Sequence, residues 1–96
     1  MIQLSKGTIE HLPVSVRDRL GNLTTLDGVG TTFLVRKESD RTTAVPETSA
    51  TTTGLTAYCL IDTNDLPEDR YELLVRLNIS GSDEIPLLGP FDFEVI

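Results

Sequence analysis

Apolar and polar side chains alternate most regularly over residues 70–79. Five apolar side chains occupy every second position there: Tyr71, Leu73, Val75, Leu77 and Ile79. Polar side chains fill most of the positions between them, and Leu74 is the exception. Because successive side chains of a strand point to opposite faces of a sheet, this pattern predicts a long β-strand with one buried face.

Shorter runs of the same kind recur along the chain, separated by Gly, Pro, Asn and Asp. The other predicted strands cover residues 8–18, 23–26, 31–37, 44–47, 55–61, 85–88 and 91–96. Pro13 lacks an N–H group, which places the first of these strands at a sheet edge or a bulge. No stretch keeps helical spacing over three turns, and one helical turn is predicted at residues 65–70. About seven strands with frequent turns predict an all-β chain, a β-sandwich of antiparallel strands that forms a single domain over residues 1–96.

The segment 42–53 is rich in Thr and Ser and supports two interpretations. It could form a flexible loop, or a pair of surface strands, since Thr is β-branched and tolerates a solvated face. We expect a mixture of the two: a short strand near residues 44–47, followed by a mobile turn through Ser49.

Composition excludes some classes of function but does not identify one. The chain has 96 residues and a net charge of −7, with 15 acidic and 8 basic residues. A strongly acidic balance repels phosphate backbones, so no nucleic-acid partner is predicted. No apolar run approaches the length of a membrane span, so no membrane role is predicted either. The first residues lack the apolar core of a signal peptide, and we expect a complete chain made in a cytoplasm.

Cys59 is the only cysteine, which excludes an internal disulfide. It lies in the apolar run 55–61, where a thiol acts as a small hydrophobic side chain. We therefore expect a buried, unreactive cysteine rather than a nucleophile.

Candidate catalytic and metal-binding residues are few. His11 is the only histidine, and we expect a structural role for it at or near the surface. An acidic cluster resembles a calcium loop: Asp62, Asn64, Asp65, Glu68 and Asp69. The EF-hand pattern fails, because Leu66 and Pro67 stand where an oxygen ligand and a Gly are needed. A looser calcium site stays open beside the simpler interpretation of a solvated turn. The predicted protein is not an enzyme and carries no cofactor.

The run from Leu66 to Tyr71 resembles the Leu-Pro-x-x-x-Tyr corner of immunoglobulin-like domains. In those domains the Tyr closes the corner before a late strand, the place that Tyr71 would take. The whole chain also resembles small immunoglobulin-like virion proteins of tailed bacteriophages, including the N-terminal domain of baseplate upper proteins. The matching phrases are residues 16–22, 32–36 and 91–95.

This resemblance implies an immunoglobulin-like β-sandwich and a structural role in the virion, after synthesis in the host bacterial cytoplasm. The position would be the capsid surface, the head–tail junction or the tail. The partners would be other virion proteins in many symmetry-related copies, with no small-molecule ligand. We expect strand edges and loops to make the contacts, and the candidate contact residues are Ile2, Leu4, Ile85 and Leu87.

A binding module for a carbohydrate or a protein ligand is the alternative. Tyr58 is the best candidate for a sugar platform, although a place in the core is the competing interpretation for this side chain.

Overall fold

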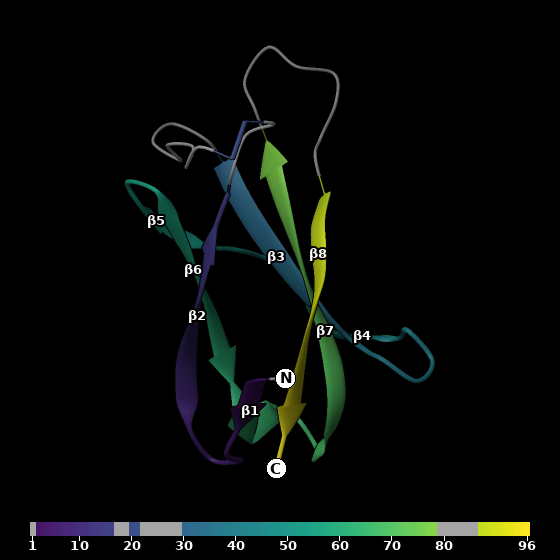
Figure 1. The fold of residues 1–96 in the computed structure, drawn as a ribbon. Helices are drawn as coiled ribbons and strands as arrows, with labels where there is room; N and C mark the ends of the chain where they lie inside the picture. Colours follow the sequence, from purple (N-terminus) through teal and green to yellow (C-terminus); the bar gives the residue numbers. More distant parts are fainter. Residues whose placement is uncertain (1, 17–19, 22–29, 79–86) are drawn as a thin grey trace.

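A computed structural model describes residues 2–16, 20–21, 30–78 and 87–96, and these residues form eight strands and one short 3-10 turn. Five strands form one sheet, in the order β1-β8-β7-β3-β4, and three form a second, in the order β2-β6-β5. The larger sheet contains β1 (Ile2–Leu4), β8 (Leu87–Val95), β7 (Asp69–Asn78), β3 (Gly30–Lys37) and β4 (Thr43–Ser49). The smaller sheet contains β2 (Ile9–Ser15), β6 (Thr56–Asp62) and β5 (Thr51–Thr53). Figure 1 shows the two sheets as two layers.

One hydrophobic core lies between the two sheets, and the alternation along each strand supplies it. The largest fully buried side chains include Tyr71, Phe33 and Phe93 from the five-stranded sheet and Ile61 from the three-stranded sheet. The rings of Tyr71 and Phe93 stack with their centroids 5.5 Å apart. The prediction of an all-β chain is therefore confirmed.

The predicted strand at residues 70–79 corresponds to β7, whose inward side chains are all buried. Leu74, the exception in the pattern, faces the other side and is also buried. It pairs with Leu34 of β3, so an aliphatic pair lies among the polar side chains of that face.

The turn between the sheets is built around Tyr71. Its hydroxyl donates a hydrogen bond of 2.6 Å to the carbonyl oxygen of Pro67, four residues earlier in the chain. Burial, and then the charge of Asp69, raise the pKa of Tyr71, so the hydroxyl keeps its proton and remains a donor. The side chain that the sequence places at this corner therefore closes it.

A 3-10 turn, η1 (Thr63–Asp65), precedes that corner. The prediction of a helical turn at residues 65–70 is wrong. The Asp62 carboxylate accepts a hydrogen bond from the Asn64 N–H, which caps the turn. Thr63 is buried, and its hydroxyl donates to the Thr8 carbonyl oxygen at 2.6 Å. One local bond and one bond to the distant Thr8 hold this turn without a longer helix.

The Thr-rich segment forms two strands rather than a strand and a mobile turn. Ser49 is the last residue of β4, which pairs with β3 in the larger sheet, and β5 pairs with β6 in the smaller one. Ala50 lies between them, and its N–H donates to the Thr31 carbonyl oxygen at 2.9 Å. Thr suits both strands because its branched side chain fits an extended, solvated edge.

The two strands predicted at the end of the chain are one strand, β8. Its pairing with β7 shifts register between Leu73 and Val75, opposite Gly89 and a cis peptide bond to Pro90. β1 runs parallel to β8, in contrast to the antiparallel pairing expected throughout. The predicted strand at residues 23–26 lies outside the described residues.

Candidate interaction surface

The outer face of the three-stranded sheet presents apolar and uncharged side chains to solvent. Along each strand the buried positions alternate with exposed ones, so every second side chain points outward. The outward side chains of this neutral face are Ile9, His11, Pro13 and Ser15 of β2, Thr51 and Thr53 of β5, and Thr56, Tyr58 and Leu60 of β6, with Asp62 at its end opposite Ile9.

The apolar members of this face are adjacent to one another. His11 lies opposite Leu60, and Pro13 lies opposite Tyr58, in the register of β2 with β6. Tyr58 is 36% exposed, Leu60 49% and Ile9 58%. Contiguous exposed apolar side chains of this kind mark sites of interaction more often than scattered ones do.

Charge is nearly excluded from the neutral face. Within the described residues of the three strands, Glu10 and Asp62 are the acidic side chains, no Lys or Arg is present, and His11 is the histidine. Glu10 pairs with the buried Ile61 and therefore lies on the inner side of the sheet. Asp62 lies at the end of β6, where its carboxylate accepts from the backbone and side-chain N–H groups of Asn64.

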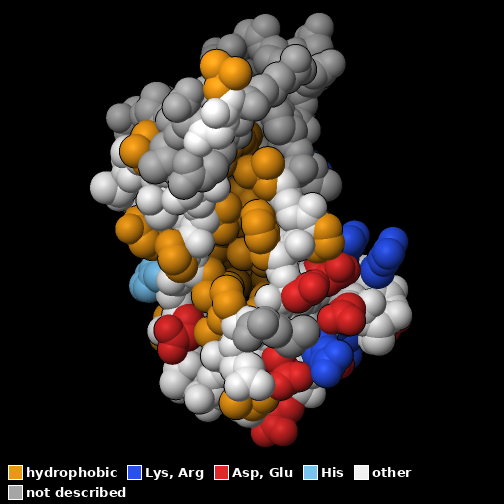
Figure 2. Space-filling model, in the orientation of Figure 1, with side chains coloured by type: hydrophobic (Ala, Val, Ile, Leu, Met, Phe, Trp, Pro, Cys, Tyr) orange, Lys and Arg blue, Asp and Glu red, His pale blue; other side chains and the backbone are white. Residues whose placement is uncertain are grey.

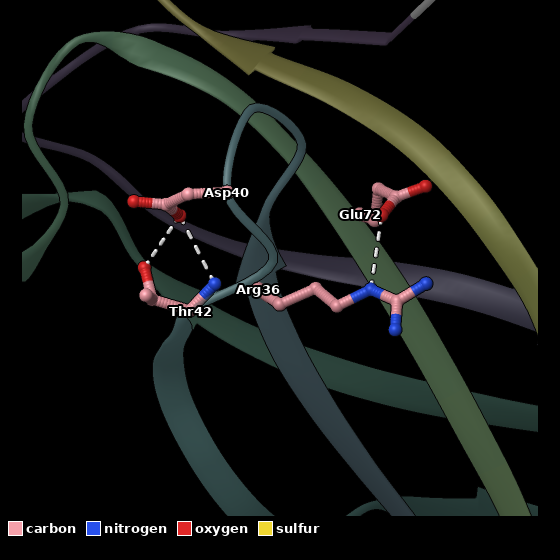
Figure 3. A network of polar contacts seen from close by, with 4 residues as sticks. All are labelled: Arg36, Asp40, Thr42 and Glu72. Atoms are coloured by element: carbon pink, nitrogen blue, oxygen red, sulfur yellow. Dashed lines mark hydrogen bonds and ion pairs between the residues drawn. The ribbon is translucent and has the colours of Figure 1, made fainter.

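The outer face of the five-stranded sheet is charged, in contrast. Arg36 Nε lies 2.9 Å from Glu72 Oε1, as Figure 3 shows. A second ion pair joins Arg70 to Glu94 at 3.3 Å, across β7 and β8. The molecule therefore has one neutral and one charged sheet face, and Figure 2 shows acidic and basic side chains gathered toward one side.

The β3–β4 turn at the edge of the charged sheet is closed by Asp40. Its carboxylate accepts hydrogen bonds from the Thr42 N–H at 3.0 Å and from the Thr42 hydroxyl at 2.7 Å (Figure 3). These two bonds lower the pKa of Asp40 from its ordinary value. The charged carboxylate is thus a part of the turn.

A groove opens between β2 and β8, where the two sheets leave the core partly uncovered (Figure 2). It encloses a cavity of about 160 Å³. Phe91 lines it and is 40% exposed, beside Ile2, Leu12 and Leu73. The groove is apolar. Both strands that flank it contain a proline, Pro13 in β2 and Pro90 in β8.

The edge strands of both sheets are poorly suited to pairing with another chain. β1 and β5 have three residues each. The other two edge strands contain a proline, Pro13 in β2 and Pro46 in β4. Short edge strands and prolines are the devices by which natural sheets avoid edge-to-edge association. A sheet face is therefore a better docking surface here than a strand edge.

The four candidate contact residues lie in different places. Ile2 is exposed at the groove, whereas Leu4 is buried in the core. Leu87 begins β8, and Ile85 lies outside the described residues. The segment from Ile2 to Leu4 pairs with Phe93–Val95 of its own chain. Contact by these four residues stays a prediction, although the buried Leu4 could contribute only backbone atoms to it.

The other candidate residues are separated or already engaged. His11 is exposed on the neutral face. The acidic cluster makes local bonds: Asp62 caps η1, and the Asp69 carboxylate accepts from the Arg70 N–H. Across the described ranges, no three His, Cys, Asp or Glu side chains are placed to share a metal ion. Nor does that part of the chain contain a helix long and apolar enough to cross a membrane.

The neutral face itself is not predicted by the sequence pattern. The run 55–61 is apolar on both sides, which indicates a central strand buried on both faces. β6 is central in its sheet, as that interpretation requires, but Tyr58 and Leu60 on its outer side are partly exposed. The expectation of a core place for Tyr58 is therefore wrong. Pro13, Ser15 and the Thr-rich run supply neutral neighbours for these side chains, but the sequence does not show that they share a sheet.

Cys59 has the buried position expected of it. The side chain is fully buried between the sheets, and burial raises the pKa of the thiol to about 11. At pH 8 the thiolate of the folded protein should be about a hundredfold scarcer than that of a thiol with the ordinary pKa of 9.0.

We expect a thiol-specific reagent at pH 8 to modify the folded protein at least about a hundredfold more slowly than the urea-unfolded protein. Mass spectrometry of samples quenched over time measures both rates. Equal rates in the two states would contradict a closed core around Cys59.

No family model, curated protein or solved structure matches this chain.

Proposed function

We propose that this chain is a non-enzymatic structural protein with an immunoglobulin-like β-sandwich fold, which acts by protein–protein contact in the particle of a tailed bacteriophage. The neutral face is the observation behind the proposed protein–protein contact. Exposure of its apolar surface to water is unfavourable, and binding of a partner removes that surface from water. The place in a virion comes from the sequence resemblance.

The strand order supports the immunoglobulin-like part of this proposal. Such sandwiches place the second, fifth and fourth strands of their lettered series, B, E and D, in one sheet, and C, F and G in the other. If β2, β5 and β6 are taken as B, D and E, and β3, β7 and β8 as C, F and G, the two sheets have this order. β4 then corresponds to the additional strand of variable-type domains.

The corner at Tyr71 supports the same assignment. In immunoglobulin-like domains a Tyr near the start of strand F bonds to backbone a few residues upstream. Tyr71 is the third residue of β7, and its hydroxyl donates to the Pro67 carbonyl oxygen. The bond lies in the connection between β6 and β7, which is the E–F corner in this assignment.

We expect the chain to be present in many copies in purified virions of the phage that encodes it, because repetition turns weak contacts into stable attachment. Quantitative mass spectrometry of purified particles measures the copy number. Supplying L60D in place of the natural chain should reduce that number, while I96D, which places the same charge at an exposed apolar position away from the face, should not. Absence of the natural chain from particles, when infected cells contain it, would contradict the proposal.

A carbohydrate-binding module is the second candidate, favoured by the exposure of Tyr58 beside Thr51 and Pro13. Sugars stack on exposed aromatic rings and take hydrogen bonds from neighbouring hydroxyls. Amide chemical-shift changes around Tyr58 upon titration with a glycan panel would favour this function over assembly.

A further inference from the structure

We infer that the neutral face is a self-association surface, on which the same face of a second copy of this chain docks. This inference rests on the proposed function and names its partner. Three features lead to it: the distribution of charge, the self-complementary character of the face and its size.

Charge is the first feature. The chain carries a net charge of −7, yet the outward side chains of β2, β5 and β6 are uncharged except for Asp62 at the sheet end. A partner of opposite sign would be held best by acidic side chains at the contact. An acidic partner can bind where the contact surface is uncharged and the charged side chains lie on the far side of the molecule. A second copy is such a like-charged partner.

Self-complementarity is the second feature. A two-fold contact brings one patch against itself, so a charged residue near the axis meets its own sign. Tyr58 and Leu60 lie on β6, the central strand of the sheet, and therefore near the middle of the face. Neither carries a charge, and two sheets can stack through such side chains as they do inside a sandwich.

Size sets the strength of the contact. Two strands of seven residues and one of three, about 4.8 Å apart with about 3.4 Å per residue, span roughly 280 Å². Stable complexes bury about 800 Å² on each partner, so a dimer formed through this smaller face is expected to be weak. Weak pairing suits a protein that is held in place by repetition.

Sedimentation equilibrium and concentration-dependent amide spectra of the whole chain, from micromolar to millimolar, test this inference. The average mass should rise toward that of two copies, with shift changes confined to β2, β5 and β6. Association should strengthen as ionic strength rises from about 0.01 M to about 0.15 M, because the screening length falls from about 30 Å to about 8 Å.

The variant L60D should weaken self-association at least tenfold, because each copy would bring a charge into the contact. L60T removes the apolar surface without adding charge and should also weaken it, while its thermal unfolding shows that the fold is kept. The matched control I96D has the same net charge as L60D and should associate as the natural chain does.

A natural chain that stays monomeric at millimolar concentration and both ionic strengths would overturn the inference, as would equal effects of L60D and I96D. If the chain is monomeric but L60D is still lost from particles, a different virion protein docks on the face, and only the self-association fails. If the chain forms dimers but is absent from particles, the proposed function fails and the self-association stands.

Discussion

Replacing Tyr71 with phenylalanine should lower the free energy of unfolding by about 1 kcal/mol, since the buried Tyr71 side chain loses its hydrogen bond to the Pro67 carbonyl oxygen. The ring itself is retained, so its stacking against Phe93 is unchanged. For a domain of this size the melting temperature should fall by roughly 4–8 °C. Urea titration followed by circular dichroism measures the free energy, and a thermal scan measures the temperature.

Y58F is the matched control for this prediction. It deletes the same hydroxyl from a residue that is 36% exposed on the neutral face, where water can replace any hydrogen bond. Its effect should be within about 0.5 kcal/mol of zero. Equal effects of Y71F and Y58F would show that the Tyr71–Pro67 bond contributes nothing to the corner.

The pH dependence of this corner follows from the direction of the pKa shift. The pKa of Tyr71 is raised above its ordinary value of 10.0 in the folded protein. The unfolded chain therefore loses the proton first as the pH rises past 10.0, and stability falls from there upward. Below that pH the contribution of Tyr71 is complete, so the difference between the natural chain and Y71F should be constant from neutral to mildly alkaline pH.

Period-two alternation was the signal that predicted most of the fold. It located β3, β6 and β7 to within a residue at most described ends, because a strand with one buried face must place its apolar side chains at every second position. It could not locate β5, since Thr51–Thr53 has no apolar residue to mark a buried face. The pairing that makes this segment a strand is with β6, and a run of threonines carries no signal for it.

For a similar reason, the sequence could not predict which strands belong to which sheet. Nothing in Thr43–Ser49 and Thr51–Thr53 indicates that the chain leaves one sheet for the other at Ala50. The parallel pairing of β1 with β8 joins the two ends of the chain, as in Ile2 with Phe93. Such pairings depend on how whole sheets stack, and one-dimensional periodicity carries no information about that.

The neutral face could not be predicted from the sequence, for a different reason. A strand that is apolar on both sides is consistent with burial on both faces or with a docking face, and the two cases have the same sequence pattern. Only the arrangement of β2, β6 and β5 as a separate outer layer distinguishes them. The corner position of Tyr71, in contrast, was expected from the resemblance of Leu66–Tyr71 to a known corner pattern, and its partner lies only four residues away.

Replacing Gly89 with alanine should lower the free energy of unfolding by about 3 kcal/mol or more, because backbone strain and a steric conflict add together. Gly89 has φ +107°, a conformation that side chains bearing a Cβ rarely adopt and that costs about 1–3 kcal/mol. A Cβ at this position would also lie 2.8 Å from the carbonyl oxygen of Leu73 and 3.1 Å from the backbone nitrogen of Phe91. Both neighbours are backbone atoms, so the β7–β8 pairing itself would have to shift.

G54A separates the two contributions. Gly54 also has a positive φ, +58°, but no atom lies within 4 Å of a Cβ built there. Its replacement should cost about 1 kcal/mol, the penalty of the left-handed conformation alone. The excess in G89A then measures the steric conflict with β7.

The consequence of G89A should extend to the groove, because Phe91 follows the bulge and lies opposite Leu73. Denaturant unfolding gives the loss of stability, and amide spectra should show changes along β7 and β8 with little change in β5. If G89A and G54A cost the same, the close approach of Gly89 to Leu73 does not constrain the sheet. In that case the register shift of β8 would tolerate a side chain, and Phe91 would be placed by the core alone.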